Sequence, residues 1–104
     1  MIPIKLNGFI DELKGSTEDN SVQWHAGADE AYFCNHKRFG LFLRYEFDPD
    51  REQSYYAFRI SVDGKDTPFM VTDSENDYDR MRDLYQAVIV NANNTVQDLT
   101  EFFE

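Results

Sequence analysis

Two stretches of alternating apolar and polar residues constrain the fold of this chain more than any other feature. Residues 41–47 and residues 56–62 each place apolar side chains at every second position. A period of two is that of a β-strand with one face on the core. Asp63-Gly64 follows the second run and is a strong signal for a two-residue hairpin turn. In the returning strand, residues 67–71, Pro68 indicates an edge position, because proline cannot donate to a ladder.

Helical periodicity flanks these strands on both sides. Residues 3–14 carry apolar side chains at helical spacing, and Gly15 predicts the end of that helix. Thr72-Asp73-Ser74-Glu75 has the pattern of a capping box that opens a long second helix. Asn93-Asn94 predicts the end of the long helix. Thr95 then opens a short last helix, which we expect to bury Leu99 and either Phe102 or Phe103.

The element order predicts one α+β domain spanning residues 1–104. Two weaker strand signals, residues 22–25 and 31–35, precede the clear ones, and Trp24 is expected in the core. The sheet is therefore antiparallel, with about four to five strands in a meander that includes the Asp63-Gly64 hairpin. An N-terminal helix, a long C-terminal helix and a short last helix flank it. A chain of this length supports a single core.

Charge is the strongest indication of function. The sequence has 20 Asp and Glu against 10 Lys and Arg, a net charge of −10. Such a surface repels nucleic acid and anionic lipid and attracts basic proteins. No stretch is long and apolar enough for a membrane span, and no leader pattern is present, so we expect no membrane association. The single cysteine, Cys34, suits the reducing cytoplasm.

The long helix is expected to carry a row of carboxylates opposite its apolar stripe. Glu75, Asp79 and Asp83 follow one another at steps of four, which places them about 6 Å apart on one face. Asp73 and Asp77 add negative charge near the helix start. The row has a spacing close to that of phosphates along a nucleic-acid strand. It therefore predicts either a phosphate mimic or an ordinary solvated helix face.

A second acidic cluster surrounds one turn. Its members are Glu46, Asp48, Asp50 and Glu52, and Asp29 and Glu30 occupy another loop between predicted strands. On the strand before the turn, Phe42 and Arg44 point away from the predicted core. Aromatic and arginine side chains are enriched at interface hot spots, so both are candidate partner-binding residues. The alternative is that the N-terminal helix covers that face of the sheet.

Catalytic and metal-binding patterns are weak. Cys34 and His36 share a strand face, and His25 lies apart, so a zinc site or a Cys/His nucleophile lacks a complete set of residues. The acidic stretch from Asp73 lacks the glycine and the final glutamate that an EF-hand loop requires. We expect no catalytic residue, no metal and no cofactor.

These features favour a non-enzymatic acidic inhibitor that binds a basic, nucleic-acid-binding protein by phosphate mimicry. Phage anti-CRISPR and anti-restriction proteins are similar in size and charge, although no motif of this chain identifies such a family. One alternative is an immunity protein that neutralises a basic nuclease toxin, with nearly the same electrostatics. A second is a small Cys/His-dependent enzyme or metal module. The sequence leaves the partner and the oligomeric state open.

Overall fold

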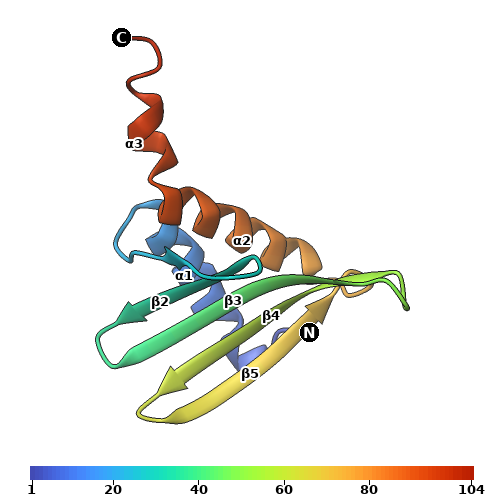
Figure 1. Cartoon of the computed structure of the whole chain (residues 1–104). Helices are drawn as coiled ribbons and strands as arrows, with labels where there is room; N and C mark the ends of the chain where they lie inside the picture. The colour runs from blue at the N-terminus through green and yellow to red at the C-terminus, as the bar shows by residue number, and fades with distance from the viewer.

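The computed structural model describes every residue from Met1 to Glu104 and contains one five-stranded antiparallel sheet (Figure 1). Its strands are β1 (His25–Ala26), β2 (Ala31–His36), β3 (Phe39–Asp48), β4 (Gln53–Val62) and β5 (Lys65–Thr72), in the spatial order β1-β2-β3-β4-β5. The helices are a 3₁₀ turn η1 (Ile4–Leu6), α1 (Asn7–Glu18), α2 (Tyr78–Asn93) and α3 (Thr95–Leu99). The predicted α+β class and element order are confirmed.

The meander has the turns that the sequence predicts. Asp63 and Gly64 both adopt positive φ, 52° and 81°, which is the conformation that a tight two-residue hairpin requires. β5 lies at one edge of the sheet, where Pro68 removes no ladder hydrogen bond. At the other edge β1 has only two residues. The central pairing of β3 with β4 spans both strands from end to end.

The helices cover one face of the sheet, and the core lies between the two layers. Leu43 of β3 and Phe58 of β4 are fully buried on that inner face, together with Leu84 of α2 and Ile10 of α1. α1 packs mainly on α2, and α2 packs on the strands. The opposite face of the sheet, which we call the outer face, carries no helix (Figure 1). The N-terminal helix therefore does not cover Phe42.

The first helix continues past Gly15, where the sequence predicted its end. Its last turn buries Thr17, whose hydroxyl accepts a hydrogen bond of 3.1 Å from the indole N–H of Trp24. Gly15 costs about 1 kcal/mol relative to alanine inside a helix. The burial of Thr17 against Trp24 offsets that cost, and α1 ends only at Glu18.

The strand predicted at residues 22–25 is largely absent, because a side chain from α2 takes its backbone hydrogen bonds. The amide group of Asn91 accepts from Trp24 N–H at 2.7 Å and donates to the carbonyl oxygens of Val22, at 2.9 Å, and Thr17, at 3.1 Å. Both Asn91 and Trp24 are buried, and the expectation for Trp24 is confirmed. This local network replaces a ladder, so β1 shortens to His25–Ala26.

The long helix begins at Tyr78, several residues later than the capping-box pattern predicted. Half of the pattern forms: the Glu75 carboxylate accepts from the Thr72 backbone N–H at 2.9 Å. The Glu75 N–H donates to the Thr72 carbonyl, at 3.0 Å, and not to the Thr72 side chain. It closes a turn at the end of β5 and does not start α2. The helix then ends at Asn93, before Asn94 in a left-handed conformation, as predicted.

The short last helix forms at Thr95–Leu99, but it buries none of the predicted residues. Leu99, Phe102 and Phe103 are 57%, 74% and 90% exposed. The reason is position: α3 leaves the end of α2 and projects away from the rest of the molecule (Figure 1). α2 is the only element that α3 contacts extensively.

The helices are all too short or too polar to span a membrane.

Candidate protein-binding surfaces

The carboxylate row predicted on the long helix does not exist. Glu75 precedes α2, so it shares no helix face with Asp79 and Asp83. The two remaining members lie 3.1 and 3.5 Å from the guanidinium of Arg82, which neutralises part of their charge. The physical cause is the late start of the helix at Tyr78. We therefore reject this face as an extended anionic surface.

The other three carboxylates near the helix start serve the fold. Asp77 accepts the backbone N–H of Ile2 at 2.6 Å, and Asp73 accepts from the Ser54 backbone N–H and hydroxyl at 3.0 and 3.1 Å. Glu75 lies 2.8 Å from the amino group of Met1, which also donates to the Met70 carbonyl. The Glu75 and Asp77 contacts fasten the N-terminus beside β5, and the Asp73 contacts link β4 to the segment after β5. Of the three carboxylates, only Glu75 lies within 4.0 Å of a cation.

The hydrogen bond from the Met1 amino group, followed by that from the Thr72 backbone, lowers the pKa of Glu75 from its ordinary value of 4.5. A lowered folded pKa stabilises the fold above the unfolded value, and the stabilisation is lost as pH falls below 4.5. We expect Glu75→Gln to lower the free energy of unfolding by no more than about 1 kcal/mol at neutral pH, because the pair is solvent-screened. Urea titrations of both proteins as a function of pH check this. A gap that persists unchanged in acid would contradict the assignment.

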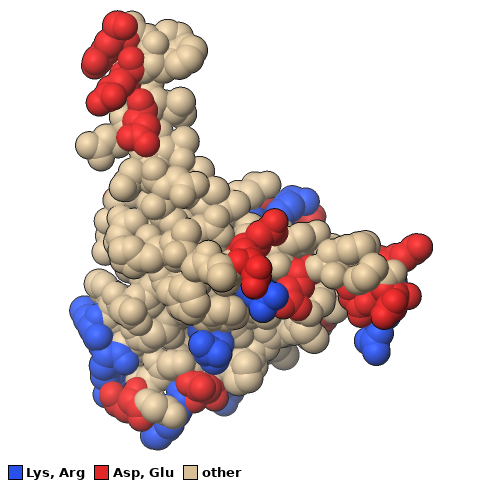
Figure 2. All heavy atoms as spheres, viewed as in Figure 1, with Lys and Arg blue, Asp and Glu red and all other residues tan.

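Two groups of carboxylates lie toward one end of the sheet, which we call the acidic end. Asp29 and Glu30 of the β1–β2 loop line a hollow with Glu46, and Asp48, Asp50 and Glu52 belong to the β3–β4 turn beyond it. Only two cations, Arg44 and Arg51, accompany them, so the group carries a net charge of six negative against two positive. Figure 2 shows Asp and Glu gathered at this end and again on the projecting C-terminal segment.

The β3–β4 turn holds its carboxylates in a fixed arrangement. Asp48 Oδ1 accepts the backbone N–H groups of Asp50, at 3.0 Å, and Arg51, at 3.4 Å, which closes the turn on itself. Glu46 accepts from the Tyr55 hydroxyl and lies 2.8 Å from Arg44 Nε. Asp50 and Glu52 are exposed and have no cation within 4.0 Å. Half of the predicted second cluster, Asp50 and Glu52, is therefore without an ion-pair partner.

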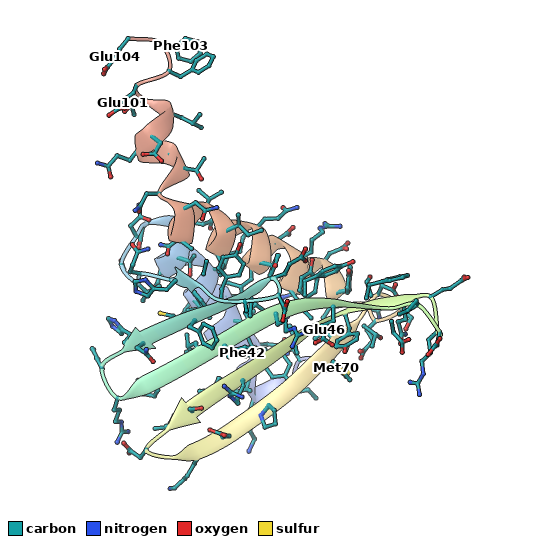
Figure 3. The ribbon with its side chains drawn as sticks, viewed as in Figure 1. Phe42, Glu46, Met70, Glu101, Phe103 and Glu104 are labelled. Atoms are coloured by element: carbon teal, nitrogen blue, oxygen red, sulfur yellow. The ribbon has the colours of Figure 1, made fainter.

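The outer face of the sheet exposes aromatic and arginine side chains. Strand register aligns Phe33, Phe42, Arg59 and Pro68 in one row across β2 to β5. The Phe33 and Phe42 rings lie 5.2 Å apart, and the guanidinium of Arg59 lies 4.9 Å from the centre of the Phe42 ring. In the next row Met70 is half exposed (Figure 3).

Phe42 and Arg44 thus lie on an uncovered face, but they differ in their surroundings. Arg44 is drawn toward the acidic end by Glu46, whereas Phe42 belongs to the aromatic row. No local sequence pattern indicates that Phe33 and Met70 join this surface. The register of β2 and β5 decides which of their residues face outward, and that register depends on pairing with strands elsewhere in the chain.

The cysteine and the histidines form no reactive group. Cys34 is fully buried in the core, and desolvation raises the pKa of its thiol, which disfavours the nucleophilic thiolate. His36 is exposed at the end of β2. No group of three or more His, Cys, Asp or Glu residues is arranged to hold a metal ion. A groove of about 520 Å³ between α1, α2 and α3 is lined mainly by polar side chains and holds neither histidine nor cysteine.

A comparison of the chain with models of known protein families, with curated proteins and with solved structures finds no match.

Proposed function

We propose that the chain acts as a non-enzymatic, acidic inhibitor of a basic, nucleic-acid-binding protein, and that the acidic end makes the contact. The observation that carries this proposal is the excess of carboxylates toward one end of the sheet, where the β1–β2 loop and the β3–β4 hairpin together carry six carboxylates and only two guanidiniums. Proteins that bind nucleic acid contact its phosphates through Lys and Arg. A fixed cluster of carboxylates complements such a groove and competes with the phosphates for it.

The rigidity of the β3–β4 hairpin supports this mechanism. Asp48 orders the turn through two backbone hydrogen bonds, so Asp50 and Glu52 are presented without further ordering. Preorganised groups lose less conformational entropy on binding than flexible ones. The net charge of −10 accelerates the first encounter with a basic partner. The carboxylates of the acidic end then occupy phosphate sites.

The proposed compartment is the cytoplasm. The chain has one cysteine, and its thiol is buried and unpaired. A lone reduced thiol is compatible with the reducing environment where nucleic-acid-binding proteins act.

Capture from a nuclease-treated cell lysate tests the class of partner. Immobilised protein is expected to retain a basic, nucleic-acid-binding protein and to release it in about 1 M salt, where the screening length falls to about 3 Å. A duplex oligonucleotide that the captured protein binds is expected to displace it in proportion to concentration. Displacement that fails, with the nucleic acid and the inhibitor bound together, would overturn phosphate mimicry.

Two charge-matched double variants test the site. Asp50→Lys with Glu52→Lys reverses two unpaired carboxylates at the acidic end, and Asp79→Lys with Asp83→Lys makes the same charge change on α2. We expect the first pair to weaken binding to the captured partner by about 10-fold or more, measured by calorimetry, and the second to weaken it much less. Equal losses would show that net charge, and not the acidic end, determines binding.

A further inference from the structure

Four large apolar side chains of the C-terminal segment, residues 95–104, are exposed to solvent. Their exposed fractions are 66% for Val96, 57% for Leu99, 74% for Phe102 and 90% for Phe103. The two phenylalanine rings pack edge to face, with centres 4.8 Å apart. Clusters of exposed apolar side chains mark interaction sites in soluble proteins. The segment is therefore a candidate for contact with another molecule.

The segment separates its apolar side chains from its charged ones. Its helical turns continue beyond α3 through backbone hydrogen bonds from residue i+3 to residue i. At about 100° per residue, the four apolar side chains fall within an arc of about 120°, and Asp98, Glu101 and Glu104 fall opposite them. Figure 3 shows Glu101 and Glu104 on one side of the segment and the Phe103 ring on the other. Helical segments that enter a groove on a partner present such an apolar strip.

The side-chain charge of the segment is wholly negative. Its three carboxylates take part in no ion pair of the chain, since none of them lies within 4.0 Å of a cation. Like charges brought together at an interface are costly, which opposes pairing of the segment with its counterpart on a second copy. The negative surface of an anionic bilayer repels the segment for the same reason. A fitting surface therefore combines apolar groups with surplus positive charge.

Neither the outer face of the sheet nor the groove between α1, α2 and α3 offers that combination. On the outer face, Arg59 is accompanied by the exposed Asp66 in the next row, so the face carries no surplus positive charge. The groove is lined mainly by polar side chains, and its one cation, Lys14, is outnumbered by Glu18 and Asp83. These features favour a different protein, and not a second copy, as the partner of the segment.

We propose that the C-terminal segment binds an apolar groove, rimmed by Lys and Arg, on the same basic protein that the acidic end contacts. This inference rests on the proposed function and adds a second, separate contact to it. Leu99, Phe102 and Phe103 enter the groove, and the carboxylates of the segment meet the cations at its rim. The segment thus supplies the burial of apolar surface that the carboxylates of the acidic end do not provide.

The two contacts lie on different parts of the molecule. The acidic end and the segment project from the body in different directions (Figure 2), and the longest dimension of the chain is 46 Å. The partner therefore presents its apolar groove within 46 Å of its nucleic-acid site. Once one contact has formed, the other becomes intramolecular, and its high effective concentration raises the affinity of the whole complex.

Calorimetry of full-length variants with the captured partner tests the second contact. The segment variant, Phe102→Ser with Phe103→Ser, is expected to raise the dissociation constant about 10-fold or more. Its heat-capacity change on binding is expected to be less negative, because less apolar surface is buried. Ile4→Ser with Met70→Ser removes two exposed apolar side chains outside both contacts and is the matched control, with the affinity of the wild type. Urea midpoints close to that of the wild type show that each variant is folded.

Salt separates the apolar part of this contact from the charged part. Asp98→Asn with Glu101→Gln and Glu104→Gln is expected to weaken binding about 3-fold at low salt. That loss shrinks as the salt concentration rises, because screening weakens the carboxylates of the wild type as well. The loss caused by the segment variant is expected to stay the same, because the burial of apolar surface is not screened. A loss for the segment variant that disappears with salt would contradict an apolar groove.

Comparison with the acidic-end variant, Asp50→Lys with Glu52→Lys, separates this contact from the proposed function. If the segment variant binds the partner like the wild type while the acidic-end variant binds weakly, the acidic end stands and this inference is wrong. The reverse result supports the segment and contradicts the acidic end. Failure to capture any basic protein would contradict both.

Two further measurements detect other occupants of the segment. Sedimentation velocity shows whether the wild type forms a dimer that the segment variant loses, and flotation with vesicles of phosphatidylcholine and phosphatidylglycerol shows whether a bilayer holds the segment. We expect a monomer that stays free of the vesicles. A dimer or a vesicle-bound chain that depends on Phe102 and Phe103, with binding to the captured protein unchanged, would overturn the inference.

Discussion

Replacing Asn91 with leucine is expected to lower the free energy of unfolding by about 3–5 kcal/mol, a large part of the total stability of a small domain. The Asn91 side chain is buried and binds three separate pieces of backbone. Leucine fills a similar volume but leaves the Trp24 N–H and the Val22 carbonyl without their partner, and the Thr17 carbonyl keeps only its hydrogen bond from the Asn20 N–H. Each buried group left unsatisfied costs about 1–3 kcal/mol.

Urea denaturation followed by tryptophan fluorescence measures this loss directly, because Trp24 is the only tryptophan and lies beside Asn91. Asn93→Leu is the matched control: it makes the same change two positions away, at an exposed residue. We expect that variant to stay within about 0.5 kcal/mol of the wild type. Equal destabilisation of the two would show that the Asn91 network does not hold the α1–β1 connection.

Two phenylalanines on opposite faces of the same sheet are expected to respond very differently to alanine. Phe58 is fully buried and stacks on Phe69 with ring centres 5.2 Å apart, so Phe58→Ala is expected to cost about 3–5 kcal/mol. Phe42 lies on the outer face and loses chiefly its contacts with Arg59 and with the Phe33 ring, each worth about 1 kcal/mol. The difference arises because only the inner face is packed against helices.

Urea midpoints of the two variants and the wild type, measured at the same protein concentration, compare the two losses. A loss for Phe42→Ala as large as that for Phe58→Ala would mean that a helix covers the outer face, contrary to the arrangement described above.

The sequence predicts the sheet well because its signals are local. Alternation of apolar residues, the Asp63-Gly64 turn and Pro68 each act within a few residues, and all three agree with the structure. The errors lie where distant residues compete with local pattern. Asn91, far along the chain, removes the strand at residues 22–25, and the Met1 amino group with Thr72 holds Glu75 in a turn before the helix.

The candidate sites are also predictable where they depend on local sequence and unpredictable where they depend on contacts between distant residues. Composition reveals the excess of carboxylates. The carboxylates of the β3–β4 turn can be predicted to lie near one another because they are close in sequence, and Asp48 accepts the backbone N–H of Asp50 within that turn. Arg82 lies three residues from Asp79 and next to Asp83, so these ion pairs can be read from the sequence. The ion pair of Glu75 depends on where the N-terminus comes to lie, and no sequence spacing contains that information. The exposure of Phe103 likewise depends on the direction in which α3 leaves the body of the protein.

Both borders of the sheet are protected against growth by strand addition. Along β5, Pro68 offers no N–H, and the Met1 amino group occupies the Met70 carbonyl that an incoming chain needs. Along β1, only two residues have strand geometry. An additional strand therefore finds no continuous template on either side, and we expect the protein to resist fibril formation.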